Sequence, residues 1–409
     1  MYQSCALNCK ERRVVIYADS SNIILHNKKN RIKDDVGLTR ISNNQHLTYK
    51  GLLLHTNQVF DQDTHESLGN SHTVFINRKL ESRLAKGEVQ KRCVETIEQK
   101  ESYKWIEGFE YSKKLLEEST QMTLVGDREA DIIELIDRLP DKKTDVVIRS
   151  QHNRYVIDKE GSKRRLIEVL SGSKVQGQME ILVRGKKRKS RKAKLDIKYI
   201  AVDLTWPKGK KTTEKNHKDG VPVYVLEVRE KKHKGYKNEP PLVWRLLTTK
   251  QIESIEQALE LIDIYKLRWR VEEYFKLLKS DCYDIENTEL TKGKSIRKLI
   301  LYVMKASIKI QQLKAARNGT KDTPLETVFS EEEIKYLNLL NPKLEGATAK
   351  QQNPYPNNEL AYGSWIIARL GGWKEFYDAS RPPGTKTFAA GIERFENIVI
   401  GIKIGKDVS

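Results

Sequence analysis

The sequence predicts an α/β protein whose core is interrupted by a β-rich insertion and followed by an all-helical C-terminal region. Short apolar, β-branched runs at residues 12–18 and 122–125 predict buried core strands. Alternating segments between about 150 and 250 predict antiparallel strands, and helical periodicity dominates from residue 252 onward. We therefore divide the chain into residues 1–149 and 251–285 as the two parts of the core, 150–250 as the insertion and 286–409 as the helical region.

The overall charge favours a polyanionic partner. The 409 residues carry a formal net charge of +19 and have a pI of about 9.5, which indicates nucleic acid first and an anionic membrane second. No apolar run approaches the roughly 20 residues that are needed to span a bilayer. The four cysteines suit reduced thiols, so we expect a cytoplasmic, nucleoid-associated protein.

Residues 252–281 read as a single long helix, because no proline or glycine interrupts them. At about 100° per residue, four polar side chains of its second half fall within roughly 60° of one another. These are Tyr265, Arg268, Glu272 and Lys279. A carboxylate beside two cations on one narrow stripe suits a metal ligand next to phosphate-binding groups. The alternative is a solvated face joined by ion pairs between residues four apart.

An apolar stripe on the same helix fixes which side faces inward. Leu267, Val271, Tyr274 and Leu278 fall together at roughly 180–240° from Tyr265, at the spacing of an inward-facing surface. Glu273 falls at about 80° and leaves the polar stripe. The pattern therefore selects Glu272 as the carboxylate of interest.

Two further carboxylates follow predicted strands. Asp19 comes directly after the strand at 12–18, and Asp127 follows the strand at 122–125. Asp131, one helical turn after Asp127, is a further candidate. A carboxylate at the rim of a sheet is well placed to bind a metal ion. Taken singly, each aspartate could instead cap a turn or a helix.

The insertion contains the most basic loops of the chain. Between residues 184 and 194, eight of eleven side chains are lysine or arginine, including Lys186, Lys187 and Arg188. A charge run of this kind can be a solvated loop. Several on neighbouring hairpins favour contact with a phosphate backbone.

Together these residues carry a resemblance to a known family. Tyr265, Arg268, Glu272 and Lys279 reproduce the Tyr-x2-Arg-x3-Glu-x6-Lys signature of bacterial insertion-sequence DDE transposases, the YREK group. Four other segments also resemble motifs of that family: Asp19-Ser20-Ser21, Glu101-Ser102-Tyr103-Lys104-Trp105, Gly126-Asp127-Arg128-Glu129-Ala130-Asp131 and Arg381-Pro382-Pro383-Gly384. The resemblance extends from about residue 13 to about residue 400.

The resemblance implies an RNase H-like catalytic core that carries Asp19, Asp127 and Glu272. It implies two Mg²⁺ ions per active site, with Mn²⁺ as a substitute. The implied reaction is cleavage of DNA at the ends of an element, passage through a hairpin and joining to a target. The implied partners are transposon ends, target DNA and a second copy of the chain in a homodimer.

The resemblance also implies DNA contacts. Tyr265, Arg268 and Lys279 would hold phosphates, Arg149 and Arg128 would contact DNA, and a flipped base would stack on Trp244. Trp244 alternates with Leu242 and Leu246, so without the resemblance a buried aromatic on a strand is the simpler interpretation.

Two departures from the family pattern keep alternatives open. Only 18 residues precede Asp19, where family members carry a helical end-recognition domain, so we expect weak sequence preference in DNA binding. Gln151 replaces a family lysine. A truncated inhibitory or relic protein that pairs with intact transposase is one alternative, and another RNase H-like nuclease is a second.

Overall fold

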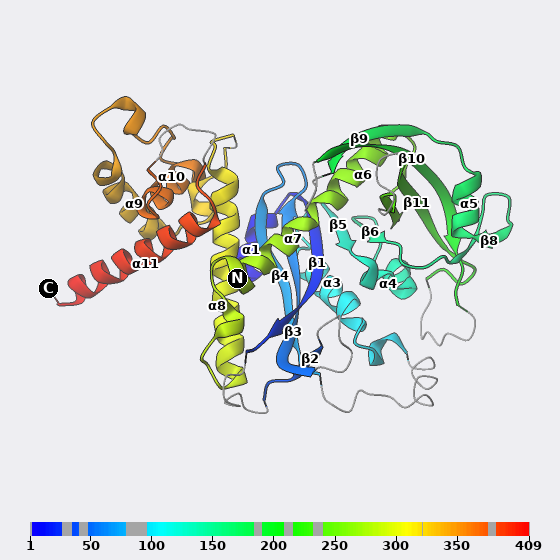
Figure 1. Ribbon diagram of the computed structural model, residues 1–409, viewed down its shortest axis with the longest axis horizontal. Helices are drawn as coiled ribbons and strands as arrows, with labels where there is room; N and C mark the ends of the chain where they lie inside the picture. Colours follow the sequence, from blue (N-terminus) through cyan, green and yellow to red (C-terminus); the bar gives the residue numbers. More distant parts are fainter. Residues whose placement is uncertain are drawn as a thin grey trace.

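The computed structural model places one mixed sheet between two layers of helices, with a cluster of further helices at one end (Figure 1). The structure describes residues 2–26, 35–40, 48–78, 96–183, 190–207, 216–231, 240–320, 322–374 and 382–408. The mixed α/β architecture agrees with the predicted fold class.

The order of the strands fixes where the carboxylates meet. Within the described residues the sheet contains β1 (Arg13–Ile24), β2 (Leu38–Arg40), β3 (Thr48–Asp61), β4 (Ser67–Ile76), β5 (Gln121–Gly126), β6 (Thr144–Arg149), β7 (Tyr155–Ile157), β8 (Lys163–Arg165), β9 (Gly177–Val183), β10 (Arg191–Leu204), β11 (Val221–Glu230) and β12 (Val243–Thr248). The order is β2-β3-β1-β5-β6-β12-β11-β10-β7-β8, with β4 beside β3 and β9 beside β10. β1, β5 and β6 are mutually parallel, whereas β3 is antiparallel to β1 and β12 is antiparallel to β6.

Both faces of β1 are buried, which explains its nearly continuous apolar sequence. Val14, Ile16 and Ala18 point into one core cluster, and Val15 and Tyr17 point into the other. The first cluster packs beneath α1 (Tyr2–Cys9), α3 (Tyr103–Leu115), α4 (Ile133–Arg138) and α5 (Leu166–Gly172). The second packs beneath α6 (Ile255–Leu267), α7 (Trp269–Lys276) and α8 (Gly293–Ala316).

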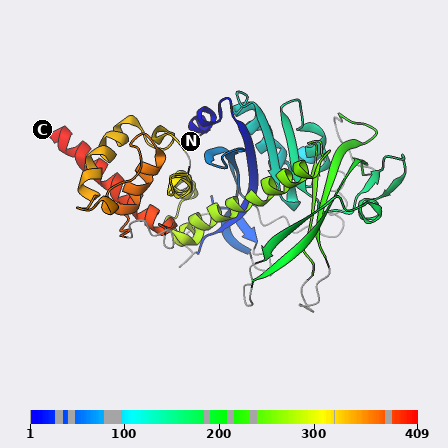
Figure 2. The same cartoon turned by 90° about the horizontal axis from the view of Figure 1, so that it is seen from above.

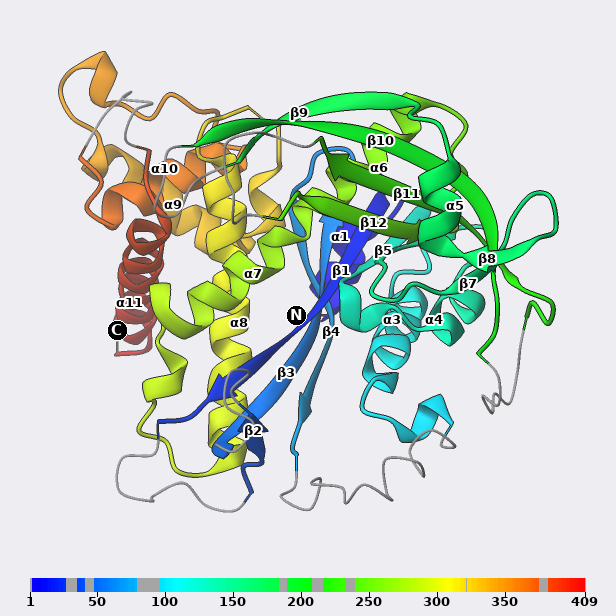
Figure 3. The same ribbon diagram turned by 45° about the vertical axis from the view of Figure 1, so that its right-hand side comes forward.

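The insertion is continuous with the core sheet. β12 pairs with β6 through Leu246 opposite Arg149 and Leu247 opposite Ile148. β11 and β10 then extend the sheet outward, and β9 to β12 arch over the core in Figure 3. Because hydrogen bonding continues from β6 to β12, side chains at the base of the insertion lie beside those of the core.

The C-terminal helices form a third core of their own. α9 (Glu331–Leu344), α10 (Leu360–Leu370) and α11 (Thr385–Val408) pack with the second half of α8 around buried aromatic residues such as Phe329, Trp365 and Phe395. Figure 2 shows this cluster at the end of the molecule opposite to the insertion. Among the described residues, no helix has both the length and the apolar character needed to cross a membrane.

Two predicted boundaries were wrong. β1 continues to Ile24, because antiparallel pairing with β3 persists as far as Gly51, so Asp19 lies inside the strand rather than at its end. The expected single helix at 252–281 is divided into α6, α7 and a π-helical turn, η4 (Leu277–Asp281).

A tertiary hydrogen bond accompanies the break between α6 and α7. The backbone N–H of Arg268 bonds to the carbonyl oxygen of Tyr265, three residues earlier, so it does not pair with Ile264. The buried hydroxyl of Tyr17 donates instead to the Ile264 carbonyl oxygen at 2.8 Å. β1 thereby satisfies the acceptor that the helix break leaves open.

We expect Tyr17→Phe to lower the free energy of unfolding by about 1–3 kcal/mol, because it leaves the Ile264 carbonyl buried without a donor. Urea denaturation followed by circular dichroism measures the change. Tyr302→Phe is the matched control, since Tyr302 is 74% exposed and its loss of a hydroxyl should be nearly neutral. Equal effects of the two substitutions would show that the Tyr17 bond does not hold α6 against the sheet.

Candidate active site

Three elements bring the predicted carboxylates to one pocket. The parallel register sets Tyr17 of β1 beside Val125 of β5, and Asp19 and Asp127 follow two residues later in each segment. α7 packs against β1 and contributes Glu272. All three side chains line a cavity of about 580 Å³, together with Arg268 and Lys279.

The helix pattern selected the glutamate that lines the pocket. Glu272 lines the pocket, whereas Glu273 is exposed outside it. Val271, Tyr274 and Leu278 of the predicted apolar stripe are completely buried. Packing of that stripe against the sheet therefore turns Glu272 toward Asp19.

The Asp19 side chain is less exposed than that of Glu272, at 13% against 34%. Burial raises its pKa to about 7, and the nearby carboxylates of Asp127 and Glu272 add to the shift, whereas the Arg268 guanidinium opposes it. One carboxylate oxygen accepts from the Ser20 backbone N–H at 2.7 Å. Desolvation therefore outweighs the ion pair, and the ionised form of Asp19 is held at a cost in free energy.

Asp127 and Asp131 have different surroundings. Asp127 caps the short helix η3 (Arg128–Ala130) by accepting from the Glu129 N–H at 2.8 Å, and it still lines the pocket. Asp131, the further candidate, does not line this pocket. Its buried carboxylate pairs with Arg154 and accepts from the backbone N–H groups of Gln151 and His152. Asp131 is thus a structural anchor for the start of the insertion.

Arg268 lies between two of the carboxylates. Its Nη1 donates to Asp19 Oδ2 at 2.9 Å, and its Nη2 donates to Glu272 Oε1 at 2.6 Å. The side chains of Arg268 and Asp19 are each 13% exposed. The guanidinium therefore neutralises two carboxylates that would otherwise repel each other in a poorly solvated space.

Lys279 also lines the pocket and is held there by β1. It lies on η4, the π-helical turn, and its Nζ donates to the Asn22 carbonyl oxygen at 2.6 Å and to Ser21 Oγ at 3.3 Å. Glu286, which the sequence patterns missed, lies 3.4 Å from Lys279 Nζ and accepts from the Ile24 N–H. Glu286 belongs to the short helix η5 (Ile285–Asn287), beyond the periodic helix, where no pattern marked it.

The remaining predicted residues that the structure describes do not line the pocket. The buried hydroxyl of Tyr265 faces the guanidinium groups of Arg268 and Arg149, which oppose the rise in its pKa that burial causes. Trp244 is partly buried on β12 opposite Val228. Arg128 is exposed on η3. Lys186, Lys187 and Arg188 lie outside the described residues.

The chemistry of the donors fits a hard divalent cation, because three carboxylates converge and oxygen ligands are what such ions prefer. Asp19, Asp127 and Glu272 are the residues that could hold one. In the described ranges, however, no three acidic, histidine or cysteine side chains are grouped closely enough to coordinate a metal ion. The Arg268 guanidinium occupies part of the space between them.

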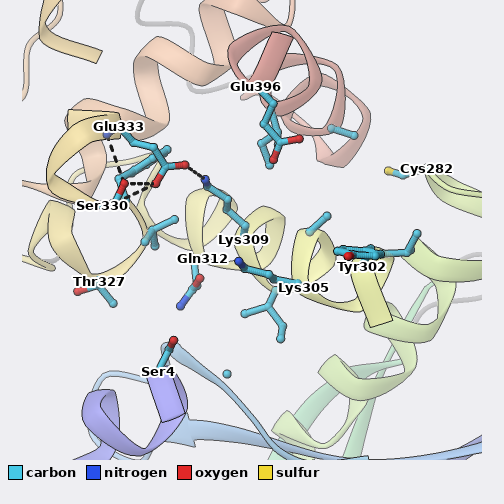
Figure 4. Close-up of a pocket in the computed structure, with 18 of the residues that line it drawn as sticks. Ser4, Cys282, Tyr302, Lys305, Lys309, Gln312, Thr327, Ser330, Glu333 and Glu396 are labelled. Carbon is cyan, nitrogen blue, oxygen red and sulfur yellow. Dashed lines mark hydrogen bonds and ion pairs between the residues drawn. The ribbon is translucent and has the colours of Figure 1, made fainter. Parts of the chain in front are cut away.

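A larger cavity lies away from these carboxylates. It has a volume of about 1230 Å³ and is lined by residues of α1, α8, α9 and α11 (Figure 4). The charged groups of Lys309 and Glu333 on its wall form an ion pair at 3.0 Å. Of the predicted site residues that the structure describes, none lines it, so its size does not make it the candidate active site.

Comparison with protein families identifies the type of enzyme. Residues 107–308 match the family model described as the transposase DDE domain. This match indicates a transposase enzyme. This transposase acts on DNA, and enzymes with such a domain generally use divalent metal ions. The match includes Asp127 and Glu272, whereas Asp19 precedes it and is brought to them by the pairing of β1 with β5.

The raised pKa of Asp19 predicts a pH-dependent loss of stability. Between pH 3.8, the ordinary pKa of an aspartate, and about pH 7, the folded protein keeps a proton on Asp19 that the unfolded chain releases. Stability therefore falls as the pH rises through this window. As the pH rises from 5 to 8, we expect the free energy of unfolding of Asp19→Asn to increase by about 2 kcal/mol relative to that of the unsubstituted chain. Urea unfolding in EDTA measures this change.

Asp263→Asn is the control for removing a charge, because Asp263 is largely exposed on the same series of helices. The difference in the free energy of unfolding between Asp263→Asn and the unsubstituted chain should stay nearly constant over the same pH range. A constant difference for Asp19→Asn as well would contradict the account of a desolvated carboxylate.

Proposed function

We propose that this transposase belongs to the YREK group and that Asp19, Asp127 and Glu272 are its catalytic carboxylates. The reaction is metal-dependent cleavage of DNA at transposon ends followed by strand transfer. The single observation that carries the proposal is the convergence of these three acids, from β1, the end of β5 and α7, on one pocket with Arg268 and Lys279. The implied division into a core, an insertion at 150–250 and a helical region after 285 is part of the same proposal.

An RNase H-like core is the fold that this proposal requires. The strand order β4-β3-β1-β5-β6 supports it, with antiparallel pairing on one side of β1 and parallel pairing on the other. The central position of β1 places Asp19 beside Asp127 and beneath α7.

The charges around the pocket suit a phosphodiester. Two Mg²⁺ ions, or Mn²⁺ in their place, would supply an activated water and neutralise charge on the leaving oxygen. Asp19, Asp127 and Glu272 would hold them. Arg268 and Lys279 would bind phosphates of the cleaved strand, and the Tyr265 hydroxyl would hydrogen-bond to one of them.

The insertion would hold the DNA. Arg149 pairs in register with Leu246 of β12, so a strand bound beside Tyr265 and Arg149 would run toward Trp244. In the hairpin step that we propose, a flipped base stacks on the Trp244 indole. Lys186, Lys187, Arg188 and Arg128 are proposed as backbone contacts.

We also propose that the transposase acts as a homodimer through its helical region, as expected for 286–409. Ile400 and Ile404 of α11 are 54% and 58% exposed, which leaves apolar surface on the last helix. Sedimentation of the full chain tests this proposal, and a strict monomer with and without DNA would contradict it.

Cleavage of a duplex that carries the inverted repeat flanking the gene tests the catalytic assignment. We expect nicking that requires Mg²⁺ or Mn²⁺ and that falls at least a hundredfold in Glu272→Gln, because the substitution removes a metal-binding charge. Glu273→Gln is the matched control, since the Glu273 carboxylate is next to Glu272 in the sequence but is exposed outside the pocket. Comparable activity of Glu272→Gln and Glu273→Gln would refute the assignment.

The same assay separates the proposed role of Trp244 from a structural one. Trp244→Ala should leave the first nick largely intact and reduce hairpin formation about tenfold or more, since stacking contributes about 1–3 kcal/mol per base. Equal loss at both steps together with a lower melting temperature would instead identify Trp244 as a core residue.

A further inference from the structure

Arg268 and a divalent cation would compete for the same oxygens. The guanidinium binds Oδ2 of Asp19 and Oε1 of Glu272 through two different nitrogens, at 2.9 and 2.6 Å. A single side chain thus joins Asp19 of β1 to Glu272 of α7 within the pocket. A metal ion bound by Asp19 and Glu272 would have to replace at least one of these contacts.

A second position for the guanidinium lies close by. Arg268 occupies the junction of α6 and α7, and its guanidinium carbon lies 6.0 Å from the centre of the Tyr265 ring. The Tyr265 hydroxyl is buried and has no hydrogen-bond partner among the described residues. The Arg149 guanidinium also acts on the Tyr265 hydroxyl and opposes the rise in its pKa. A phosphate placed beside these two groups would offer Arg268 a new anionic partner.

We propose that Arg268 acts as an internal cation that holds Asp19 and Glu272 together until a DNA phosphate draws it away. Its departure opens the two carboxylates to a divalent ion. This inference rests on the proposed function, because it uses the same carboxylates as metal ligands. DNA binding and metal binding then strengthen each other by the same factor, since coupling between two sites is reciprocal.

The exchange has a functional consequence. With Arg268 across the pocket, the transposase holds its carboxylates neutralised and resists loading with metal. Once a phosphate backbone is seated, the same arginine becomes a DNA contact and the carboxylates become available. Metal-dependent cleavage is thereby confined to the DNA-bound enzyme.

Binding of Mn²⁺ alone to the full chain tests the exchange without any catalytic readout. Electron paramagnetic resonance measures free Mn²⁺ directly. We expect Arg268→Gln to bind Mn²⁺ more tightly than the unsubstituted chain, by a factor within the range of about 5–150 typical of coupled sites. Adding the inverted-repeat duplex should tighten Mn²⁺ binding in the unsubstituted chain but not in Arg268→Gln, after subtraction of Mn²⁺ bound by DNA alone.

Lys279→Gln is the matched control. Lys279 lines the same pocket and carries the same charge, but it contacts neither Asp19 nor Glu272 at ion-pair distance. The Lys279→Gln substitution therefore measures the through-space electrostatic effect of removing one positive charge from the pocket. Equal tightening by the two substitutions, or a DNA effect that persists in Arg268→Gln, would overturn the exchange.

A Glu272→Gln arm distinguishes failure of this inference from failure of the proposed function. If Glu272→Gln binds Mn²⁺ as tightly as the unsubstituted chain, the pocket is not the metal site and both proposals fail. If Glu272→Gln weakens binding while Arg268→Gln does not tighten it, only the exchange is wrong. Should Arg268→Gln fail to fold, the effect of DNA on the unsubstituted chain decides, and its absence refutes the exchange.

Discussion

The candidate active site depends on the parallel pairing of β1 with β5. That register sets Asp19 beside Asp127, although a long stretch of chain lies between them, and it leaves both facing α7. A shift of one residue would turn Asp19 to the opposite face of the sheet, because side chains alternate along a strand. The alternating burial of Val14, Val15, Ile16 and Tyr17 in two different core clusters resists such a shift.

The helices then adapt to the sheet. The break at Arg268 frees the Ile264 carbonyl, which the Tyr17 hydroxyl satisfies, and the chain resumes as α7 with Glu272 over β1. The π-helical turn that follows delivers Lys279 to the polar end of β1, where Asn22 and Ser21 accept from it. π-Helical turns are rare and concentrate at functional sites, and this one serves the pocket.

The electrostatics of the pocket are balanced against folding. Burial raises the pKa of Asp19, and repulsion by the carboxylates of Asp127 and Glu272 raises it further. Arg268 offsets that repulsion by pairing with both Asp19 and Glu272. A protein selected for stability alone would gain from replacing such a cluster, so its presence is consistent with a functional role.

Periodicity predicted the parts of the site that local packing controls. The apolar stripe of Val271, Tyr274 and Leu278 determines which glutamate faces the sheet, and simple helical geometry selected Glu272 over Glu273. The strand beginning near residue 13 was likewise evident from its apolar sequence.

Features that depend on tertiary partners could not be read from the chain. No glycine or proline marks the break at Arg268, which accompanies a hydrogen bond from β1. The extension of β1 past Asp19 follows from pairing with β3, and Asp131 could be separated from Asp127 only by seeing Arg154 beside it. Glu286 follows a π-helical turn that shifts the register of any helical projection.

Metal-directed cleavage of the polypeptide tests the central claim most directly. With Fe²⁺ in place of Mg²⁺, and with ascorbate and peroxide, hydroxyl radicals form at the bound ion and cut the backbone close to it. In the presence of DNA, the account predicts fragments that end near Asp19, Asp127 and Glu272 together, and their suppression by excess Mg²⁺. Cuts confined to other segments, or cuts that Mg²⁺ does not suppress, would show that these three carboxylates do not form one metal-binding active site.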